Sequence, residues 1–314
     1  MESPQNIKKR LRSVNNINKI TKAMEMVAAT KMRKSQEIAL ASRPYAFAAL
    51  DLLATVSNLN EKLPELFEKR KIKTVLFVLV SSDKGLAGAF NSSVFRKFEQ
   101  HMKRDEEKYA EEEKAYVAVG EKAFNYLTIK KLNVIEKFVS IGDYTTPEQA
   151  HPLADFLIAG YVGKKWDRVV IVSTHFKSAL KQEPHVRRIL PIDFDHIKET
   201  VQEIIPERGK FADLMKENQI NFVPDKSKAK QYLIEPTPEE VLGKLAEHLF
   251  FIQIYHLILE ANASEHSARR VAMKTASDNA SDLGEALNLQ YNKSRQSKIT
   301  TEISEISAGA EALS

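Results

Sequence analysis

The stretch PTPEEVLGKLAEHLFFIQIYHLIL, residues 236–259, decides the fold, because no proline follows its second one. Thr237 is a suitable N-cap, Pro238 suits the first helical position, and the two glutamates that follow place negative charge in the first turn. The sequence therefore predicts one helix over residues 237–312. At about 1.5 Å per residue it would reach on the order of 100 Å, whereas an average globular helix has roughly 10–14 residues. Such a helix needs a partner along its length.

The predicted helix carries apolar residues at alternating spacings of three and four, which is typical of a coiled coil. Small side chains then replace the large ones, and small side chains allow two helices to approach closely. The periodic positions are Leu242, Leu245, Leu249, Ile252, His256, Leu259 and Ala263, and the small residues are Ala261, Ala263, Ser264, Ser267, Ala268, Ala272, Ala276 and Ala280. We expect this helix to be one of two helices in a thin helical pair.

The N-terminal segment shows the same periodicity. No proline interrupts it between Pro4 and Pro44, and its apolar side chains again recur every three or four residues. The apolar positions are Ile7, Leu11, Val14, Ile17, Ile20, Met24 and Val27. We predict a helix from about residue 5 to 58, bent at Pro44.

The two ends of the chain carry opposite charge. Residues 1–43 contain ten Lys or Arg against three Asp or Glu, whereas residues 239–314 contain seven against eleven. Solvated helix faces account for such runs, and so does pairing of the two ends with each other or with charged partners. We expect the two terminal helices to pair as a long antiparallel coiled coil.

The middle of the chain has another pattern. Short β-branched runs at 74–82, 115–120 and 168–176 predict buried strands, and helical segments near 91–108 and 147–160 separate them. Alternating strands and helices favour a parallel, Rossmann-like α/β domain. The predicted division is a helix at 1–58, an α/β domain at 70–235 with a surface insertion at 193–231, and a helix at 237–312.

Few residues point to chemistry. The chain has no cysteine, which excludes disulfides, thiolate metal sites and a cysteine nucleophile. Its eight histidines form neither an HExxH motif nor a cluster with metal spacing, and no GxSxG motif occurs. We therefore expect no catalytic residue, cofactor or metal. The longest apolar run, residues 249–259, is too short to span a bilayer.

Two other functions stay open at this point. The turn SSDKGLAGAFN, residues 81–91, follows a strand and precedes a helix, so Gly85 and Gly88 could cradle a phosphate in a Rossmann-type enzyme with a coiled-coil dimerisation arm. It matches neither phosphate-binding glycine motif, and a tight structural turn explains it equally well. The basic segment 7–22 could bind nucleic acid, but it has no aromatic residue to stack on bases, so no nucleic acid is expected.

Several segments together closely resemble the gamma subunit of F-type ATP synthases. They cover both terminal helices almost end to end and the centre more loosely. The segments are ITKAMEMVAATKMRKSQ (20–36), ASRPYA (41–46), SSDKGLAGAFN (81–91), VAMKTASDNA (271–280) and LQYNKSRQSKITTEISEISAGA (289–310). The last contains the pattern ITxEIxEIxxGA, which is especially specific to that family.

The resemblance implies a rotor shaft that catalyses nothing itself. Its partners would be the ring of alpha and beta subunits, the epsilon subunit and the c-subunit ring, at the cytoplasmic face of the cell membrane as a peripheral protein. Proton flow would turn the c-ring and the shaft together. The shaft would then change the conformations of the beta subunits, where ATP is made or hydrolysed.

The resemblance also implies contact residues. Those expected to meet the beta subunit are Met24, Arg295, Gln296, Thr300 and Glu302. Those expected near the c-ring are Tyr232 and Glu235. Without the resemblance each is an ordinary helix-surface or turn residue. The glycine turn departs from the family at Ala87 and Ala89, and the absence of cysteine rules out the thiol switch that some photosynthetic relatives carry in an insertion near 193–231.

Overall fold

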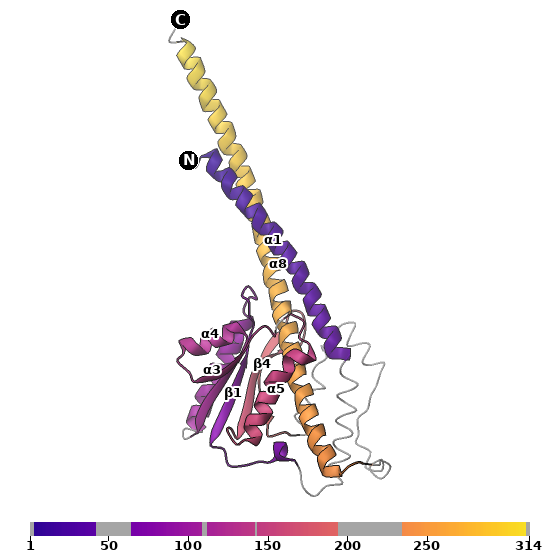
Figure 1. The fold of residues 1–314 in the computed structure, drawn as a ribbon. Helices are drawn as coiled ribbons and strands as arrows, with labels where there is room; N and C mark the ends of the chain where they lie inside the picture. The colour runs from indigo at the N-terminus through magenta and orange to yellow at the C-terminus, as the bar shows by residue number, and fades with distance from the viewer. Residues whose placement is uncertain (1–2, 42–63, 109–111, 142, 194–233, 312–314) are drawn as a thin grey trace. The chain divides into compact units, whose positions relative to one another are not determined.

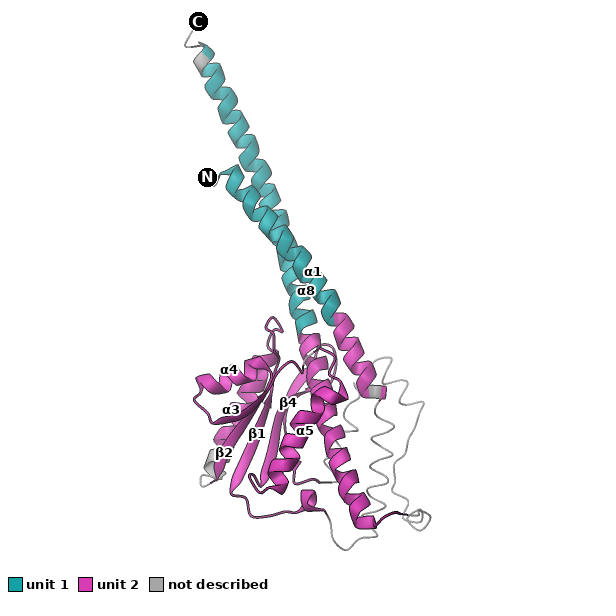
Figure 2. Cartoon of the chain, viewed as in Figure 1, with its two compact units in different colours: residues 1–28, 269–314 teal, residues 29–268 magenta. Residues whose placement is uncertain are grey.

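In the computed structural model the chain forms two compact units, coloured separately in Figure 2. One unit holds residues 1–28 and 269–314, and the other holds residues 29–268. The described residues are 3–41, 64–108, 112–141, 143–193 and 234–311. The predicted helix beyond residue 41, its bend at Pro44 and all but the first residue of the predicted insertion lie outside them.

Two helices contribute to both units. The first is α1 (Pro4–Ala41), and the second is α8 (Pro238–Glu311), which has 74 residues. The structure thus contains the long C-terminal helix that its proline-free sequence predicts. At 1.5 Å per residue α8 alone is about 110 Å long.

The second unit contains a five-stranded sheet with the order β3-β2-β1-β4-β5 (Figure 1). The strands are β1 (Thr74–Val80), β2 (Glu113–Val119), β3 (Val134–Phe138), β4 (Arg168–Phe176) and β5 (Gln182–Leu190). The first four are mutually parallel, but β5 runs antiparallel to β4. The prediction of a purely parallel sheet is therefore wrong at this edge. The sequence of β5, QEPHVRRIL, is charged and contains Pro184, a residue that sheets tolerate on edge strands.

Helices cover both faces of this sheet. The helices α3 (Phe90–Lys108) and α4 (Glu121–Ile129) bury one face, and α5 (Pro147–Val162) and α8 bury the other. A short 3-10 helix, η1 (Glu65–Phe67), joins the core on the α5 and α8 side. The central strand β1 is buried on both faces from Val75 to Val80, as its continuous apolar sequence predicts.

Within the second unit much of α8 is buried on all sides rather than along a single face. Every residue from Leu249 to Ser267 is buried, including Gln253, His256, Glu260 and Asn262. The expectation of a one-sided coiled-coil surface is therefore wrong for this part of the helix, because the sheet and α5 bury its large side chains. This enclosure holds polar groups of α8 in an apolar core.

In the first unit the buried face of α1 differs from the predicted apolar face. Ile7, Thr21 and Ala28 are buried, whereas Ile17 is 49%, Ile20 is 59% and Val27 is 54% exposed. Buried and half-buried positions recur at spacings of four and three, at Ile7, Leu11, Val14, Asn18, Thr21, Glu25 and Ala28, and Met24 beside them is half-buried as well. The face is thus continued mainly by polar and small residues after Val14, while Ile17, Ile20 and Val27 are exposed.

The part of α8 in the same unit has matching periodicity. Met273, Ser277, Ala280, Gly284 and Leu287 are buried, again at spacings of four and three. Ser277 Oγ donates a hydrogen bond of 2.7 Å to Asn18 Oδ1 of α1. A Cβ on Gly284 would lie 3.4 Å from Asn15 Oδ1. The two segments therefore contact each other at these positions.

Candidate functional site

The turn after β1 is held together by its own side chains. Ser82 N–H donates to Asn91 Oδ1 at 3.1 Å, and the carboxylate of Asp83 accepts from Glu121 N–H at 3.1 Å and from Ser140 N–H at 3.0 Å. A carboxylate thus occupies the end of the sheet where a phosphate would need positive groups. The geometry supports the structural interpretation of this turn over a nucleotide site.

A cavity between α3 and β5 has a volume of about 690 Å³. It is lined by Arg96, Lys97 and Arg104 and by one carboxylate, that of Glu183. Lys181 Nζ and Lys177 Nζ lie 2.8 and 3.0 Å from that carboxylate and lower the pKa of Glu183 to about 2. The lining of the cavity is therefore mainly positive, which suits an acidic surface better than a chemical reaction.

A metal site does not emerge either. Among the residues that the structure describes, no three His, Asp or Glu side chains are grouped so that they could bind a metal ion. In the same residues, no helix combines the length and the apolarity that a membrane span requires.

The residues expected to contact partners lie mainly on the surface. Arg295, Gln296, Thr300 and Glu302 fall within two turns of α8, and all are exposed. Thr300 Oγ1 donates to the carbonyl oxygen of Gln296 at 3.0 Å, and Lys298 Nζ lies 3.5 Å from the carboxylate of Glu302. The structure therefore brings these four together on one helix and leaves their faces accessible.

Large apolar side chains accompany this polar group. Ile299 is 47%, Ile303 is 59% and Ile306 is 72% exposed. Spacings of four and three place them on one side of α8. An apolar helix side of this kind is typical of a protein-binding surface.

The other three expected contact residues are distributed differently. Met24 on α1 is half-buried, and Glu235, just before α8, is exposed. Tyr232 lies outside the described residues. Nothing in the structure joins Glu235 to a described polar group, so its expected contact with a c-ring stays a prediction.

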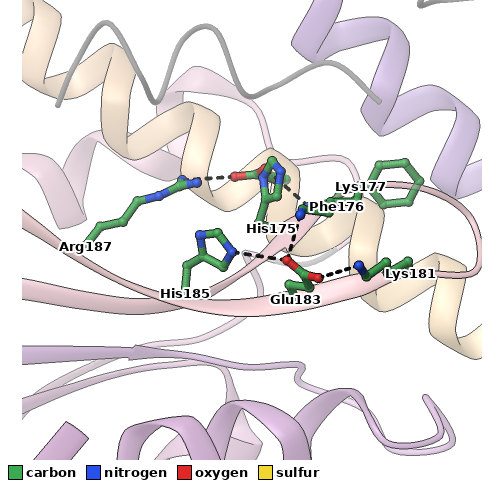
Figure 3. A network of polar contacts seen from close by, with 8 residues as sticks. His175, Phe176, Lys177, Lys181, Glu183, His185 and Arg187 are labelled. Atoms are coloured by element: carbon green, nitrogen blue, oxygen red, sulfur yellow. Dashed lines mark hydrogen bonds and ion pairs between the residues drawn. The ribbon is translucent and has the colours of Figure 1, made fainter. Parts of the chain in front are cut away.

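A buried polar cluster that the sequence analysis missed lies between α8 and the sheet (Figure 3). Glu260 of α8 is 4% exposed. His175 Nδ1 donates to Glu260 Oε1, Arg187 Nη1 donates to Glu260 Oε2 at 3.3 Å, and Phe176 N–H donates to Glu260 Oε1 at 3.3 Å. The helix is thereby bonded to both β4 and β5.

The charge state of Glu260 follows from its surroundings. Burial alone raises the pKa of a carboxyl group, but the hydrogen bond from His175 and the charge of Arg187 outweigh it, so the pKa of Glu260 lies below its ordinary value. Glu260 is consequently held as an anion in a buried position. A lone carboxylate that follows the apolar run at 249–259 is the sequence signal that could have indicated it.

A second set of buried bonds holds α8 to the loop before α5. Tyr255 OH donates to Thr145 O at 3.1 Å, and Asn262 Nδ2 donates to Thr145 Oγ1 at 2.6 Å and to Ile141 O at 3.1 Å. The same loop contacts α1, because Lys31 Nζ lies 2.6 Å from Asp143 Oδ1. These bonds lie within the second unit.

Comparison with known proteins connects this arrangement to one class. The sequence model of a family described as ATP synthase matches residues 3–313. A protein of Roseiflexus castenholzii named ATP synthase gamma chain is 35% identical over 316 residues, which cover 100% of this chain and 99% of the relative. One of Trichlorobacter lovleyi with the same name is 36% identical over 315 residues, with 100% and 99% coverage.

Solved structures resemble the fold. The rotor of the Euglena gracilis mitochondrial ATP synthase has a TM-score of 0.60 at 18% identity and covers 94% of this chain and 98% of its own. A chain in the central stalk and c-ring structure of the Tetrahymena thermophila mitochondrial enzyme has a TM-score of 0.55 at 23% identity, with 82% and 99% coverage. The fold is thus one found in ATP synthase central stalks. With full-length identity of about a third to named relatives, the chain belongs to the ATP synthase gamma chain family.

Proposed function

We propose that this chain is the central rotor shaft of an F-type ATP synthase and that it couples rotation of a c-ring to conformational changes in the beta subunits. The carrying observation is the helix α8, whose segment beyond Tyr291 exposes Ile299, Ile303 and Ile306 beside the polar group at 295–302. A helix of this length that exposes apolar side chains requires covering by other subunits. A ring of alpha and beta subunits supplies such a cover.

The proposal includes a mechanical argument. A single shaft presents a different face to each of three equivalent beta subunits, so it biases the conformational equilibrium of each site differently. Rotation exchanges these biases among the sites. Because the shaft acts through contacts, it needs no catalytic group of its own, and we assign it a non-catalytic role.

The proposed shaft is an antiparallel coiled coil of α1 and α8. The hydrogen bond between Ser277 and Asn18 and the closeness of Gly284 to Asn15 support it, as do the matched spacings of three and four on both helices. Alanine, serine and glycine on the shared face keep the pair thin. The boundaries at 1–58, 70–235 and 237–312, and the peripheral character of the insertion 193–231, are part of the same proposal.

The proposed partners follow from the same placement. Met24, Arg295, Gln296, Thr300 and Glu302 would contact the beta subunit, and Tyr232 and Glu235 would lie near the c-ring. The epsilon subunit and the c-ring would bind the α/β domain. The protein would then be peripheral, at the cytoplasmic face of the cell membrane. Two of the similar structures are a mitochondrial rotor and a central stalk with its c-ring, which supports these partners.

The test is reconstitution of this chain with alpha and beta subunits. A bead fixed to the α/β domain should rotate stepwise when ATP is added, and ATPase activity should depend on the chain. A stable complex whose bead stays still would contradict the shaft function. Nucleotide binding by the chain alone would instead support an enzyme with a nucleotide site in the turn 81–91.

A further inference from the structure

The buried polar bonds of α8 fall on two nearly opposite sides of the helix. Tyr255 and Asn262, seven residues apart, share the side that faces the loop before α5, because seven residues are close to two full turns. Glu260 lies about 140–160° away from them around the axis and faces β4 and β5. Bonds on opposite sides resist rotation of the helix about its own axis more than bonds on one side do.

The side of α8 that carries Glu260 is held by ionic hydrogen bonds, whereas the residues around it are held by apolar packing. Apolar side chains of similar size can exchange places in a core at modest cost, because hydrophobic contact is not directional. Glu260 has one compatible position, in which both carboxylate oxygens find donors: Oε1 accepts from His175 and from the N–H of Phe176, and Oε2 accepts from Arg187. A helix that turns past this position leaves a buried carboxylate without its cation, which is strongly unfavourable.

The loop side reaches the other helix as well. Asp143 pairs with Lys31 of α1 at 2.6 Å, and His266 Nε2 of α8 lies 3.8 Å from the same carboxylate oxygen. Lys31 lowers the pKa of Asp143 although burial acts to raise it. The loop therefore holds α1 and α8 at the same place in the second unit.

From this geometry we propose that Glu260 is the positioning residue that locks α8 to the sheet and transmits torque between the α/β domain and the helix, with His175 and Arg187 as its sheet-side partners and Tyr255 and Asn262 as the opposing loop-side bonds. The proposal rests on the rotor function proposed above. In the complete enzyme the c-ring turns the domain, and the helix must turn with it. Slippage at this junction would allow ATP to be hydrolysed without the corresponding movement of protons.

The test uses the complete ATP synthase in sealed vesicles and measures ATP hydrolysis and ATP-driven proton uptake in the same preparation. The variant Glu260→Gln removes the charge and keeps the size of the side chain. Glu247→Gln is the matched control, because Glu247 lies on the same helix and is exposed. We expect Glu260→Gln to retain hydrolysis within about twofold and to lose at least threefold in protons moved per ATP, with Glu247→Gln equal to the wild type.

Further variants distinguish a role of Glu260 in torque transmission from a role in folding alone. A residue needed only for folding would lower the amount of assembled enzyme and leave protons per ATP unchanged, which would overturn the proposal. Glu260→Asp retains the charge and should restore most of the ratio. If Glu260→Gln does not assemble, Arg187→Gln takes its place, because the Arg187 side chain is at the margin of the cluster at 12% exposure. Failure of both variants to assemble would show a folding role alone.

The wild-type enzyme distinguishes a failure of the proposed rotor function from a failure of the proposed lock at Glu260. A wild-type complex in which the chain does not rotate would remove the rotor function itself. A wild-type complex that rotates and pumps, together with a Glu260→Gln enzyme of normal ratio, would leave the rotor function standing and remove the lock.

Discussion

Ser277 of α8 donates a hydrogen bond of 2.7 Å to the side-chain oxygen of Asn18 on α1, although 259 residues separate them in the chain. Ser277 is buried at 8% exposure, and Asn18 is half-buried. A hydrogen-bonded polar pair between two helices favours one register, because a shift leaves both groups without these partners. The pair therefore specifies which turns of the two helices meet.

Replacing Ser277 by Ala should lower the free energy of unfolding of the full chain by about 0.5–1.5 kcal/mol, because the Asn18 amide loses its partner. Asn18→Ala should cost a similar amount. The double variant should cost less than the sum of the single variants, because each removes the same bond. Denaturant unfolding of all four proteins measures this coupling. Additive losses would show that the bond contributes nothing to stability.

The contact between these residues also shows what the sequence could predict. The length of α8 and the strands β1 and β4 follow from the absence of proline and from continuous apolar runs. The buried face of α1 does not, because after Val14 it is continued by Asn18, Thr21 and Glu25, while Ile17 and Ile20 point outward. A rule that assigns large apolar residues to the buried face therefore fails for this part of α1.

Two further misses have the same physical origin. Strand β5 is charged because it lies at the sheet edge, and its Arg187 reaches a buried carboxylate that no local pattern indicates. Glu260 is hydrogen-bonded to His175, which is 85 residues away in the chain, so the sequence around Glu260 does not indicate the pair. The expected contact residues Arg295, Gln296, Thr300 and Glu302 could be named only through resemblance, since all four are exposed and no local pattern distinguishes them.

Gly160 of α5 should not tolerate a side chain. A Cβ there would lie 1.8–2.4 Å from three ring atoms of the buried Trp166, so the ring would have to move within a filled core. Gly160→Ala should lower the free energy of unfolding by about 1–3 kcal/mol, the usual cost of overpacking. Gly243→Ala is the control, because nothing lies within 4 Å of its Cβ position on α8, and it should stabilise by about 0.5–1 kcal/mol. Thermal unfolding of both variants checks the opposite signs.

Glu260 should make stability depend on acid. Its pKa in the folded protein is lowered from the ordinary 4.5, so the folded state favours the anion more than the unfolded state does. The stabilisation is fully present above about pH 5 and is lost as the pH falls below 4.5 toward the folded pKa. Removing one partner of a buried pair costs about 3–5 kcal/mol, so Glu260→Gln should be much less stable than the wild type at pH 7.

The measurement is denaturant unfolding of the wild type and Glu260→Gln between pH 3 and pH 7. The gap between the two proteins should narrow as the pH falls below 4.5. A constant gap over this range would show that Glu260 is not held as an anion.

The exposed pair at the end of α8 should matter for coupling and not for folding. Lys298 and Glu302 lie 3.5 Å apart with more than half of each side chain exposed, so the pair adds little to stability. Glu302→Ala and Thr300→Ala should each change the free energy of unfolding by no more than about 0.5 kcal/mol. In the reconstituted complex with alpha and beta subunits, we expect each to lower ATP-driven rotation about fivefold, which corresponds to about 1 kcal/mol at a contact.

The control for this comparison is Asp278→Ala, which removes the exposed pair formed by Lys274 and Asp278 four residues apart on the same helix. The two pairs have the same spacing and similar exposure, so they differ mainly in their place along α8. Asp278→Ala should leave rotation within twofold of the wild type. Equal losses in Asp278→Ala and Glu302→Ala would mean that helix charge in general, rather than contact near Thr300, governs rotation.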